Sequence, residues 1–584
     1  MTVSRETPDE FSRVTTTPDP GPLHDESRRT WWVFLALAVV VATALRLAYP
    51  SGIAVEHFDE GVYASNLWCP DTLVPGNYSY PDRHLYAPPL LPASIETSQL
   101  LLGTSGLATI VPSLLAGVVL IVVLGAMVRD WLGEPTARVV VVLAVSSDVH
   151  ILFSRTALTD VSWITWLVIA TGLAHRGLVG GRLPVLAAAG IATGLGWWTK
   201  YTGWLPLAVT AAGIAATVVL VPATRQRCRT WLLRLCLIIA VTAATIAPLL
   251  WSLGETGGYG PVARNHARFL VGISGWPASA IEQARNLMQL ESLLTVLGLL
   301  LASWLASGPV GRFTWNAIVP RLLLPLLLAG FAAVASFTLI VIPLAIFALV
   351  DGFREIRRRT AKSLSGDDRH LAWGMLAAWW IAMTVTIPLY YPYPRLSLPW
   401  LVAGWILVGR GIVTLTTAAD VANRSGRQSL AVAGLGLLLL IIAVPAGLLP
   451  RAIPAWQSRT AIADLADQLI DRVTTAHPEG LVVVRVWGEP ALFYQLSVRG
   501  PQRLLLQPAG GLAVIGPDQP VPEAPVFLVV GPHVIESDQA RQQDWSAFTQ
   551  VDGFKIRPGL QVRLNQPSDR REQAMPFRLL RWHP

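Results

Sequence analysis

The feature that most constrains this chain is a succession of long apolar segments. A transmembrane helix needs about 20 predominantly apolar residues, and about 13 segments of this kind follow one another. They cover residues 31–49, 107–128, 137–153, 160–175, 183–199, 202–221, 231–251, 291–307, 315–331, 333–350, 371–389, 396–414 and 429–448. Only 14% of the 584 residues are charged, against about 25% in soluble proteins. The sequence therefore excludes a soluble enzyme and a nucleic-acid-binding domain.

Basic clusters between the apolar segments predict how the chain is oriented. They lie at 225–234, 354–362 and 424–427. Loops rich in Lys and Arg remain on the cytoplasmic side of a membrane. With 13 spans and a cytoplasmic N-terminus, all three clusters face the cytoplasm. We therefore expect an integral membrane protein, in a bacterial inner membrane, whose C-terminal region is extracytoplasmic.

Three parts follow from this topology. Residues 1–30 are predicted to be a disordered cytoplasmic tail, residues 31–450 a transmembrane domain and residues 451–584 an extracytoplasmic domain. The main outer loops of the transmembrane domain are expected at 50–106 and 252–290. The predicted fold class is thus mainly α, a polytopic membrane helix bundle with a small C-terminal α/β domain.

Patterns within the C-terminal region support that α/β prediction. Apolar residues recur with helical spacing over 460–473, and the β-branched runs 481–487 and 526–530 are typical of buried strands. Residues 554–564 suggest a hairpin through Pro558-Gly559. Two roles remain open for this domain: a structural cap, or a part that binds the acceptor or covers a cavity.

The sharpest candidate for a chemical site lies just after the first apolar segment, where Asp59 and Glu60 are adjacent. Ionised side chains beside a membrane are costly unless they are hydrated, paired or functional. One of the two carboxylates could serve as a general base while the other orients a substrate. The alternative is a solvated loop with two ordinary acids.

Four further candidates reach the same predicted face. They are the turn with Arg155 and Asp160, Lys200 at the end of a span, the loop with Tyr393 and Arg395, and the loop with Arg264 and His266. Each has a plainer reading as a helix cap, a snorkelling lysine, an interface anchor or an amphipathic helix. The three cysteines, Cys69, Cys228 and Cys236, have no zinc-ligand spacing.

Taken in order, these features resemble membrane glycosyltransferases of the GT-C fold. The resemblance is to the bacterial branch with the aminoarabinose transferases and RgtA/B/C/D-like proteins, and to the related protein O-mannosyltransferases. It is carried by Asp59-Glu60 with Tyr63, Pro88-Pro89-Leu90, Arg155 with Asp160, Gly194 to Lys200, Arg395 to Pro399, and Val486-Trp487-Gly488-Glu489-Pro490.

The resemblance implies a helix bundle with an outer cavity and a polyprenyl-phosphate-linked sugar as donor. The acceptor would be a hydroxyl or amine on a lipid, glycan or protein, attacked in an inverting single displacement. No cofactor is required, although the outer acids could hold a divalent cation. The implied catalytic residues are Asp59, Glu60 and Asp160; the donor-phosphate ligands Arg155, Lys200, Arg395, His266, Arg264 and His84; and the cavity residues His57, Tyr63, Tyr86 and Tyr393.

One departure from the family pattern concerns the residues before the double proline. The aminoarabinose transferases have an acid and a lysine there, whereas this chain has Tyr86 and Ala87. A different sugar or acceptor is therefore expected. The other functional hypothesis is a transporter or flippase of lipid-linked sugars, which would need polar pathways at the membrane midplane. A membrane-embedded scaffold is a third.

Overall fold

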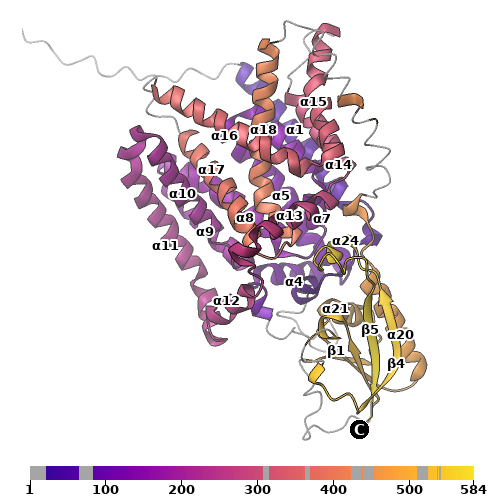
Figure 1. Ribbon diagram of the computed structural model, residues 1–584. Helices are drawn as coiled ribbons and strands as arrows, with labels where there is room; N and C mark the ends of the chain where they lie inside the picture. The colour runs from indigo at the N-terminus through magenta and orange to yellow at the C-terminus, as the bar shows by residue number, and fades with distance from the viewer. Residues whose placement is uncertain are drawn as a thin grey trace, which may run out of the picture.

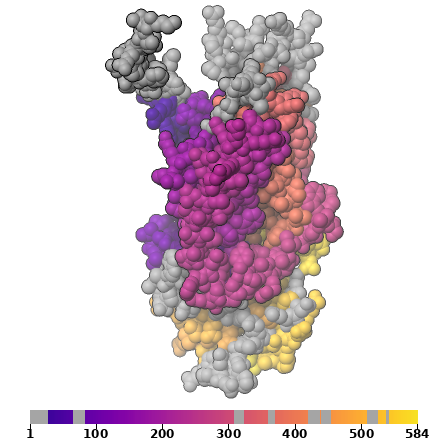
Figure 2. Space-filling view, turned by 90° about the vertical axis from the view of Figure 1, so that its left-hand side faces the viewer, coloured from indigo at the N-terminus to yellow at the C-terminus, as the bar shows by residue number. Residues whose placement is uncertain are grey.

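The computed structural model describes residues 22–64, 83–306, 315–361, 369–422, 453–509, 524–535 and 541–583, with a few single positions between them. A bundle of long helices forms most of the molecule, and a small domain with a β-sheet lies at one end of it (Figure 1). The space-filling view shows the same elongated arrangement, with the C-terminal domain in orange and yellow below the bundle (Figure 2). The predicted fold class is confirmed.

The bundle helices correspond closely to the predicted apolar segments. They are α1 (Pro22–Leu47), α5 (Gly106–Leu132), α6 (Glu134–Ser146), α7 (Asp148–Ser154), α8 (Thr159–Gly180), α9 (Leu183–Thr199), α10 (Leu205–Leu220), α11 (Arg225–Glu255), α14 (Leu293–Ala306), α15 (Trp315–Ala335), α16 (Phe337–Ala361), α17 (Arg369–Thr386) and α18 (Leu398–Ala422). Because α1 begins at Pro22, residues 22–30 are helical rather than disordered as expected. The predicted segment 429–448 lies almost entirely outside the described residues.

The structure does not confirm the expected number of 13 spans. Within the described residues, six helices are long and apolar enough to cross a membrane, or up to eight if each of two bent pairs is one span. One pair is α6 with α7, bent by 59°, and the other is α13 (Gly272–Leu290) with α14, bent by 87°. Three further apolar helices are shorter than a full span. The count of 13 is therefore not confirmed.

Buried carboxylates cap the starts of two bundle helices, α14 and α16. Asp148 accepts hydrogen bonds from the backbone N–H groups of Ser292 and Thr295, at 2.9 and 3.1 Å, where α14 begins. Glu291 accepts bonds from the first two backbone N–H groups of α16, at 2.7 and 2.8 Å. The first turn of a helix has unpaired N–H groups and a positive dipole end, which such anions satisfy.

Two of the three basic clusters lie at the same end of the bundle. The 225–234 cluster lies at the start of α11, and Arg354, Arg357 and Arg358 lie near the end of α16. The start of α11 and the end of α16 lie at the end of the bundle opposite the C-terminal domain (Figure 1). The 424–427 cluster lies outside the described residues.

Short elements connect the bundle to the C-terminal domain. They are α2 (Phe58–Ala64), η2 (Arg83–Leu85), α4 (Leu90–Leu102), α12 (Tyr259–Ala267), α13, η4 (Ile387–Leu389) and η5 (Pro394–Ser397). They come from the segments that the sequence analysis predicts to lie on, or to end at, one side of the membrane. Every candidate motif of the sequence analysis lies on these elements or on the helix ends beside them.

The C-terminal domain contains a five-stranded sheet in the order β2-β1-β3-β5-β4. Its strands are β1 (Val482–Trp487), β2 (Leu504–Ala509), β3 (Val526–Val530), β4 (Phe548–Ile556) and β5 (Met575–Trp582), and its main helices are α20 (Ala461–Ala476) and α21 (Pro490–Arg499). The strands predicted at 481–487 and 526–530 and the helix predicted at 460–473 are confirmed. The hairpin predicted at 554–564 is wrong, because α24 (Leu560–Arg563) follows β4, and β4 pairs with β5 instead.

The domain is joined to the membrane domain by direct contacts. A Cβ added to Gly61 of α2 would lie 2.2 Å from the backbone nitrogen of Ala491 of α21, so only glycine fits there. The Tyr494 hydroxyl lies 3.0 Å from the Gln99 amide and 2.7 Å from the Thr109 hydroxyl. The helix that carries Asp59 therefore rests on the C-terminal domain.

Candidate active site

Asp59 lies in the first turn of α2, and its carboxylate forms an ion pair with Arg395 at the end of the bundle. Asp59 Oδ2 is 2.7 Å from a terminal nitrogen of Arg395, and both side chains are largely buried, with 14% and 17% of their surface exposed. Burial raises the pKa of Asp59, but Arg395, followed by His57 and Lys200, outweighs that effect and holds the pKa below its ordinary value. Asp59 is therefore ionised at neutral pH.

Asp160 forms a second ion pair with Lys200, at 2.6 Å. Asp160 lies in the first turn of α8, whose N-cap is Leu158 and has no side-chain cap. The carboxylate is thus not used as the helix cap that the sequence also allowed. The Lys200 ammonium lies 5.3 Å from the centroid of the Trp163 ring, a cation–π distance. The acid and the ring together fix the ammonium in place.

The two pairs belong to one charge cluster, defined here as Asp59, Arg395, Asp160 and Lys200. Lys200 contributes to the low pKa of Asp59, and Asp160 acts electrostatically on Arg395. Tyr63, with 4% of its surface exposed, faces the same charges. Burial and then Asp59 raise its pKa well above the usual range, so it remains a neutral hydroxyl.

Aromatic side chains line the cluster on the side of α12 and the 390–393 loop. The Arg395 guanidinium lies 5.5 Å from the Tyr393 ring centroid. Burial raises the pKa of Tyr393 to about 12. His266 lies 6.1 Å from the Tyr201 ring, and burial, followed by Lys200, lowers its pKa to about 4. His266 is therefore a neutral imidazole, able to hydrogen-bond but not to neutralise a phosphate.

Glu60 does not share the surroundings of its neighbour Asp59. It is fully buried and forms an ion pair with Arg459 of the C-terminal domain. It also accepts hydrogen bonds from the backbone N–H groups of His57 and Ala157, at 2.9 Å each. With its oxygens occupied in this way, the structure gives Glu60 the contacts of a structural residue that joins the two domains.

Arg155 is also separated from the charge cluster. Its guanidinium donates hydrogen bonds to the carbonyl oxygens of Arg46, at 2.8 Å, and Tyr49, at 3.3 Å. The last carbonyls of a helix have no partner within the helix, and Arg155 satisfies those of α1. The phosphate role predicted for Arg155 finds no support in this geometry.

Four predicted residues remain. The side chains of Arg264 and His84 have no described contact with the charge cluster, whereas His57 and Tyr86 lie beside it. Arg264 is exposed on α12, and Tyr201 donates a hydrogen bond to the backbone carbonyl of His84 rather than to its ring. His57 lies beside the cluster, where its Nδ1 accepts a bond from the Asp59 N–H at 3.0 Å. The Tyr86 ring is 5.8 Å from the Phe58 ring, at the edge of the same region.

Sequence reasoning missed two groups of the C-terminal domain that reach the site region. Arg459, 4% exposed, bonds both Glu60 and the backbone carbonyl of Arg155. Glu489 and His533 form an ion-pair contact of 3.0 Å. Glu489 lies in a motif that the resemblance had marked, whereas a single arginine in a polar segment carries no signal of its own.

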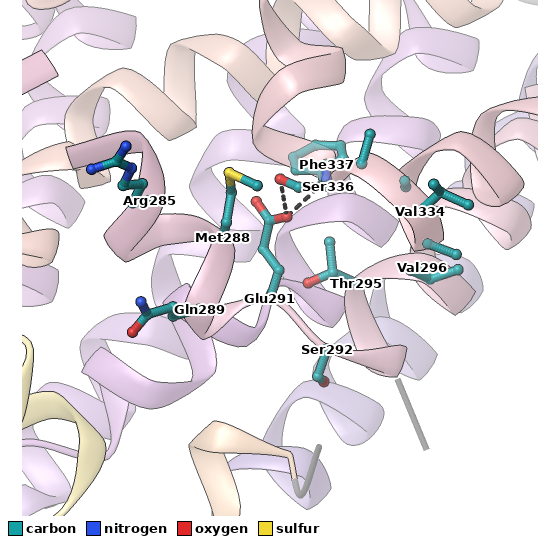
Figure 3. A pocket seen from close by; sticks show the side chains of 13 residues that line it. Arg285, Met288, Gln289, Glu291, Ser292, Thr295, Val296, Val334, Ser336 and Phe337 are labelled. Atoms are coloured by element: carbon teal, nitrogen blue, oxygen red, sulfur yellow. Dashed lines mark hydrogen bonds between the residues drawn. The ribbon is translucent and has the colours of Figure 1, made fainter. Parts of the chain in front are cut away.

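A cavity between helices of the bundle is lined by none of the residues of the charge cluster. It has a volume of about 270 Å³ and is lined by residues of α13, α14, the end of α15 and the start of α16. Figure 3 shows Glu291 at its centre, with its carboxylate bonded to the start of α16. Because that carboxylate is already used as a helix cap, the cavity offers no free acid or base for a reaction.

Metal-ligand clusters are absent from the part of the chain that the structure describes, where no three His, Cys, Asp or Glu side chains could hold one ion. Instead, each acid of the charge cluster has a Lys or Arg partner. The arrangement can hold an anion between two cations, with a carboxylate beside it.

One protein family matches part of the chain that contributes to the charge cluster. Residues 86–251 match the family described as dolichyl-phosphate-mannose-protein mannosyltransferase. The matched segment includes Asp160 and Lys200 of the charge cluster, and it confirms the resemblance to membrane glycosyltransferases. No curated protein matches the chain in sequence.

Several solved structures are similar to this chain. ArnT from Cupriavidus metallidurans, bound to undecaprenyl phosphate, is 15% identical with a TM-score of 0.49, and the match covers 94% of this chain and 98% of ArnT. An Archaeoglobus fulgidus oligosaccharyltransferase tethered with an acceptor peptide is 12% identical with a TM-score of 0.43, over 87% of this chain and 70% of that one. AglB from the same organism, with an inhibitory peptide and a dolichol-phosphate, is also 12% identical with a TM-score of 0.43, over 82% and 65%.

Proposed function

We propose that this protein is a membrane glycosyltransferase that moves a sugar from a polyprenyl-phosphate donor to an acceptor hydroxyl at the extracytoplasmic face. The observation that carries the proposal is the charge cluster, in which two carboxylates and two cations meet at one end of an apolar bundle. The description of the family that residues 86–251 match names dolichyl-phosphate-mannose, a sugar linked to a lipid phosphate. A polyprenyl-phosphate donor belongs to the same chemical class.

The reaction is a single displacement with inversion at the sugar C1. The acceptor oxygen forms a bond to C1 while the bond from C1 to the phosphate oxygen breaks. The electron pair of the broken bond remains on the phosphate, and Asp59 accepts the proton of the acceptor hydroxyl. Asp59 suits this role because it is ionised at neutral pH and partly accessible, whereas Glu60 is sealed from solvent.

Lys200 and Arg395 stabilise the charge that develops on the leaving phosphate. Preorganised cations in a partly dry site stabilise such charge more strongly than they would in water. Arg395 can contact phosphate oxygens through two N–H groups at once. Asp160 acts as a positioning residue, because it holds the Lys200 ammonium at 2.6 Å. Arg155 is not used, since its donors are bonded to the end of α1.

We propose that the cations of the cluster, rather than a bound metal, neutralise the phosphate. Each carboxylate of the cluster is already neutralised by Lys200 or Arg395, so the acids offer little net charge to a divalent ion. A phosphate entering between the pairs meets two positive groups directly. A lipid monophosphate carries little enough charge for this to suffice.

Transfer in proteoliposomes tests the proposal. Protein purified and reconstituted with radiolabelled polyprenyl-phosphate mannose and a membrane extract should yield a labelled product that remains after the lipid is hydrolysed. Asp59→Asn should lower the rate by about 10²–10⁴-fold, as expected for loss of a general base. Glu60→Gln serves as the adjacent control for carboxylate loss, checked for folding by thermal unfolding. Movement of the lipid across the bilayer without any product would instead support a flippase.

A further inference from the structure

The 390–393 loop leads into Arg395 and has few backbone donors of its own. Pro392 lies within the loop and Pro394 follows it, and proline has no N–H group to donate. Buried backbone carbonyl groups need hydrogen-bond donors, so this loop depends on donors from other segments. Arg395 follows Pro394 in η5, and its position therefore depends on how the loop is held.

Three buried side chains of α13 supply donors to this loop. Ser279, Gln283 and Asn286 are spaced by four and three residues, which places them on one side of a helix. Each donates to one carbonyl oxygen of the loop: Ser279 to that of Tyr390 at 2.7 Å, Asn286 to that of Pro392 at 2.7 Å and Gln283 to that of Tyr393 at 2.9 Å. One face of α13 thus follows the loop from its first residue to its last.

Gln283 also joins both ends of the short helix that contains Arg395. Its amide nitrogen donates to the backbone carbonyl of Tyr393, the N-cap of η5, and to the hydroxyl of Ser397, the last residue of η5. Ser397 is buried as well. Breaking a buried hydrogen bond leaves a polar group unsatisfied, which is costly. Gln283 therefore resists any shift of η5 relative to α13.

The segment before α13 and the C-terminal domain hold α13 itself. Leu270, just before α13, forms an isolated antiparallel bridge with Tyr390 of the loop. Glu282 of α13 forms an ion pair of 2.8 Å with Arg571 of the C-terminal domain, and both side chains are largely buried. Glu282 directly precedes Gln283. The C-terminal domain is therefore connected to the loop through a single turn of α13.

We propose that α13 is a positioning element of the donor site, in which Ser279, Gln283 and Asn286 hold Arg395 in place beside Asp59. This proposal rests on the proposed transferase function and deepens it, because it names residues that act through Arg395 rather than on the substrate. It also gives the C-terminal domain a role, since the ion pair to Glu282 braces α13.

The proposed reaction requires Arg395 to keep its place. A terminal nitrogen of Arg395 lies 2.7 Å from Asp59, and the same guanidinium stabilises the leaving phosphate in the proposed mechanism. A misplacement of about 1 Å can lower a rate by about 10²-fold. Loss of one donor of α13 leaves the other two bonded to the loop. A single substitution should therefore give a partial effect.

Transfer by the full chain in proteoliposomes tests this role. Gln283→Met keeps the length of the side chain and removes its amide. It should lower kcat/KM for polyprenyl-phosphate mannose by about 2–10-fold, the value of one net hydrogen bond. Burial raises the pKa of Asp59, and Arg395, followed by His57 and Lys200, opposes that effect. A loosened Arg395 should therefore also move the acid limb of kcat/KM to higher pH.

Two further variants separate positioning from general damage to α13. Trp276→Phe removes another side-chain donor of the same helix, which bonds the Val385 carbonyl at 2.8 Å, and should change neither kcat/KM nor the acid limb. In the Arg395→Gln background, Gln283→Met should cause no further loss, because residues that act through one group are not additive.

A milder variant and a variant of the C-terminal domain complete the set. Should Gln283→Met fold poorly in a thermal unfolding check, Ser279→Ala replaces it, and it should give both changes. Arg571→Gln should give the same two changes to a smaller extent. A native profile in Arg571→Gln would overturn the bracing role of the C-terminal domain.

The outcomes separate this proposal from the proposed function. A native kcat/KM and a native acid limb in the folded Gln283 or Ser279 variant would overturn the positioning role, and the transferase would stand. A further loss when Gln283→Met is added to Arg395→Gln would also overturn it, because Gln283 would then act elsewhere. Absence of transfer in the native protein would overturn the proposed function, and the positioning role with it.

Discussion

Replacement of Arg395 by glutamine tests how the charge cluster sets the state of the proposed base. In the native protein, burial raises the pKa of Asp59, and Arg395 is the first of the groups that outweigh it. An arginine next to an aspartate lowers its pKa by about 1–3 units. Without Arg395, burial dominates, and the pKa of Asp59 should rise above its ordinary value.

This shift should appear in the pH dependence of transfer. The native enzyme keeps Asp59 ionised down to a pH below the ordinary aspartate value, so kcat/KM should show no acid limb above about pH 4 from this group. Arg395→Gln should show an acid limb at a higher pH than the native enzyme, because burial then raises the pKa of Asp59. At pH 8.5 Asp59 is ionised again in the variant. Any loss of kcat/KM that remains there, about 10²–10³-fold for one preorganised hydrogen-bonding group, measures the contact of Arg395 with the phosphate.

Thermal unfolding of the same variant gives an independent measurement. In the native protein, the lowered pKa of Asp59 stabilises the fold above the unfolded-state pKa of about 3.9, and this contribution is lost as the pH falls through the folded-state pKa. In Arg395→Gln the folded-state pKa is the higher one, so the sign reverses. The variant should gain stability as the pH falls through the raised folded-state pKa of Asp59.

Control variants isolate the effect of the charge. Arg395→Lys keeps a cation and should retain most of the native pH profile. Arg264→Gln removes an exposed arginine from α12 and should leave the profile unchanged. If Arg395→Gln had the same acid limb as the native protein, then Arg395 would not control the protonation of Asp59, and the assignment of Asp59 as a base tuned by this pair would be refuted.

Four further perturbations have defined outcomes. Arg459→Gln leaves the buried Glu60 carboxylate without its partner. It should destabilise the protein by about 3–5 kcal/mol, measured as thermal unfolding in detergent. Adding Glu60→Gln to the same chain should recover part of that loss. Gly61→Ala forces α2 away from Ala491 and should lower both stability and transfer, with faster proteolysis between the domains as the readout. Lys200→Gln should raise the KM for the polyprenyl-phosphate donor and lower kcat, measured as transfer in proteoliposomes. Treatment with EDTA should leave the transfer rate unchanged, and a loss restored by Mg²⁺ or Mn²⁺ would contradict metal-free stabilisation of the phosphate.

Much of the fold could be predicted because apolar runs and basic loops are local signals. The positions of the bundle helices follow directly from them, and so does the gathering of the candidate motifs at one end. The number of spans could not be predicted in the same way. The segment 137–153, predicted as one span, is divided into α6 and α7 with a bend of 59°, where the Ser147 side chain caps α7. Three other apolar helices are shorter than a full span, and the length of an apolar run does not show where its helix ends.

The site was predictable in its members but not in their partners. Asp59 and Glu60 are adjacent in sequence, but neighbouring residues of a helix point about 100° apart. One therefore faces Arg395, while the other faces Arg459. Arg155 and Lys200 illustrate the same limit. Both are cations at helix ends, and only the tertiary arrangement decides that one bonds carbonyl groups while the other meets a carboxylate.

The pairing of every cation in the cluster with a carboxylate gives the proposed reaction an internal order. Two carboxylates and two cations leave the cluster with no net charge, which limits the free-energy cost of burying it. A donor phosphate that binds Arg395 draws the guanidinium from Asp59, and burial then raises the pKa of Asp59 again. On the proposed mechanism, the carboxylate becomes a stronger base only when the leaving group is in place, so donor binding prepares Asp59 to accept the proton of the acceptor hydroxyl.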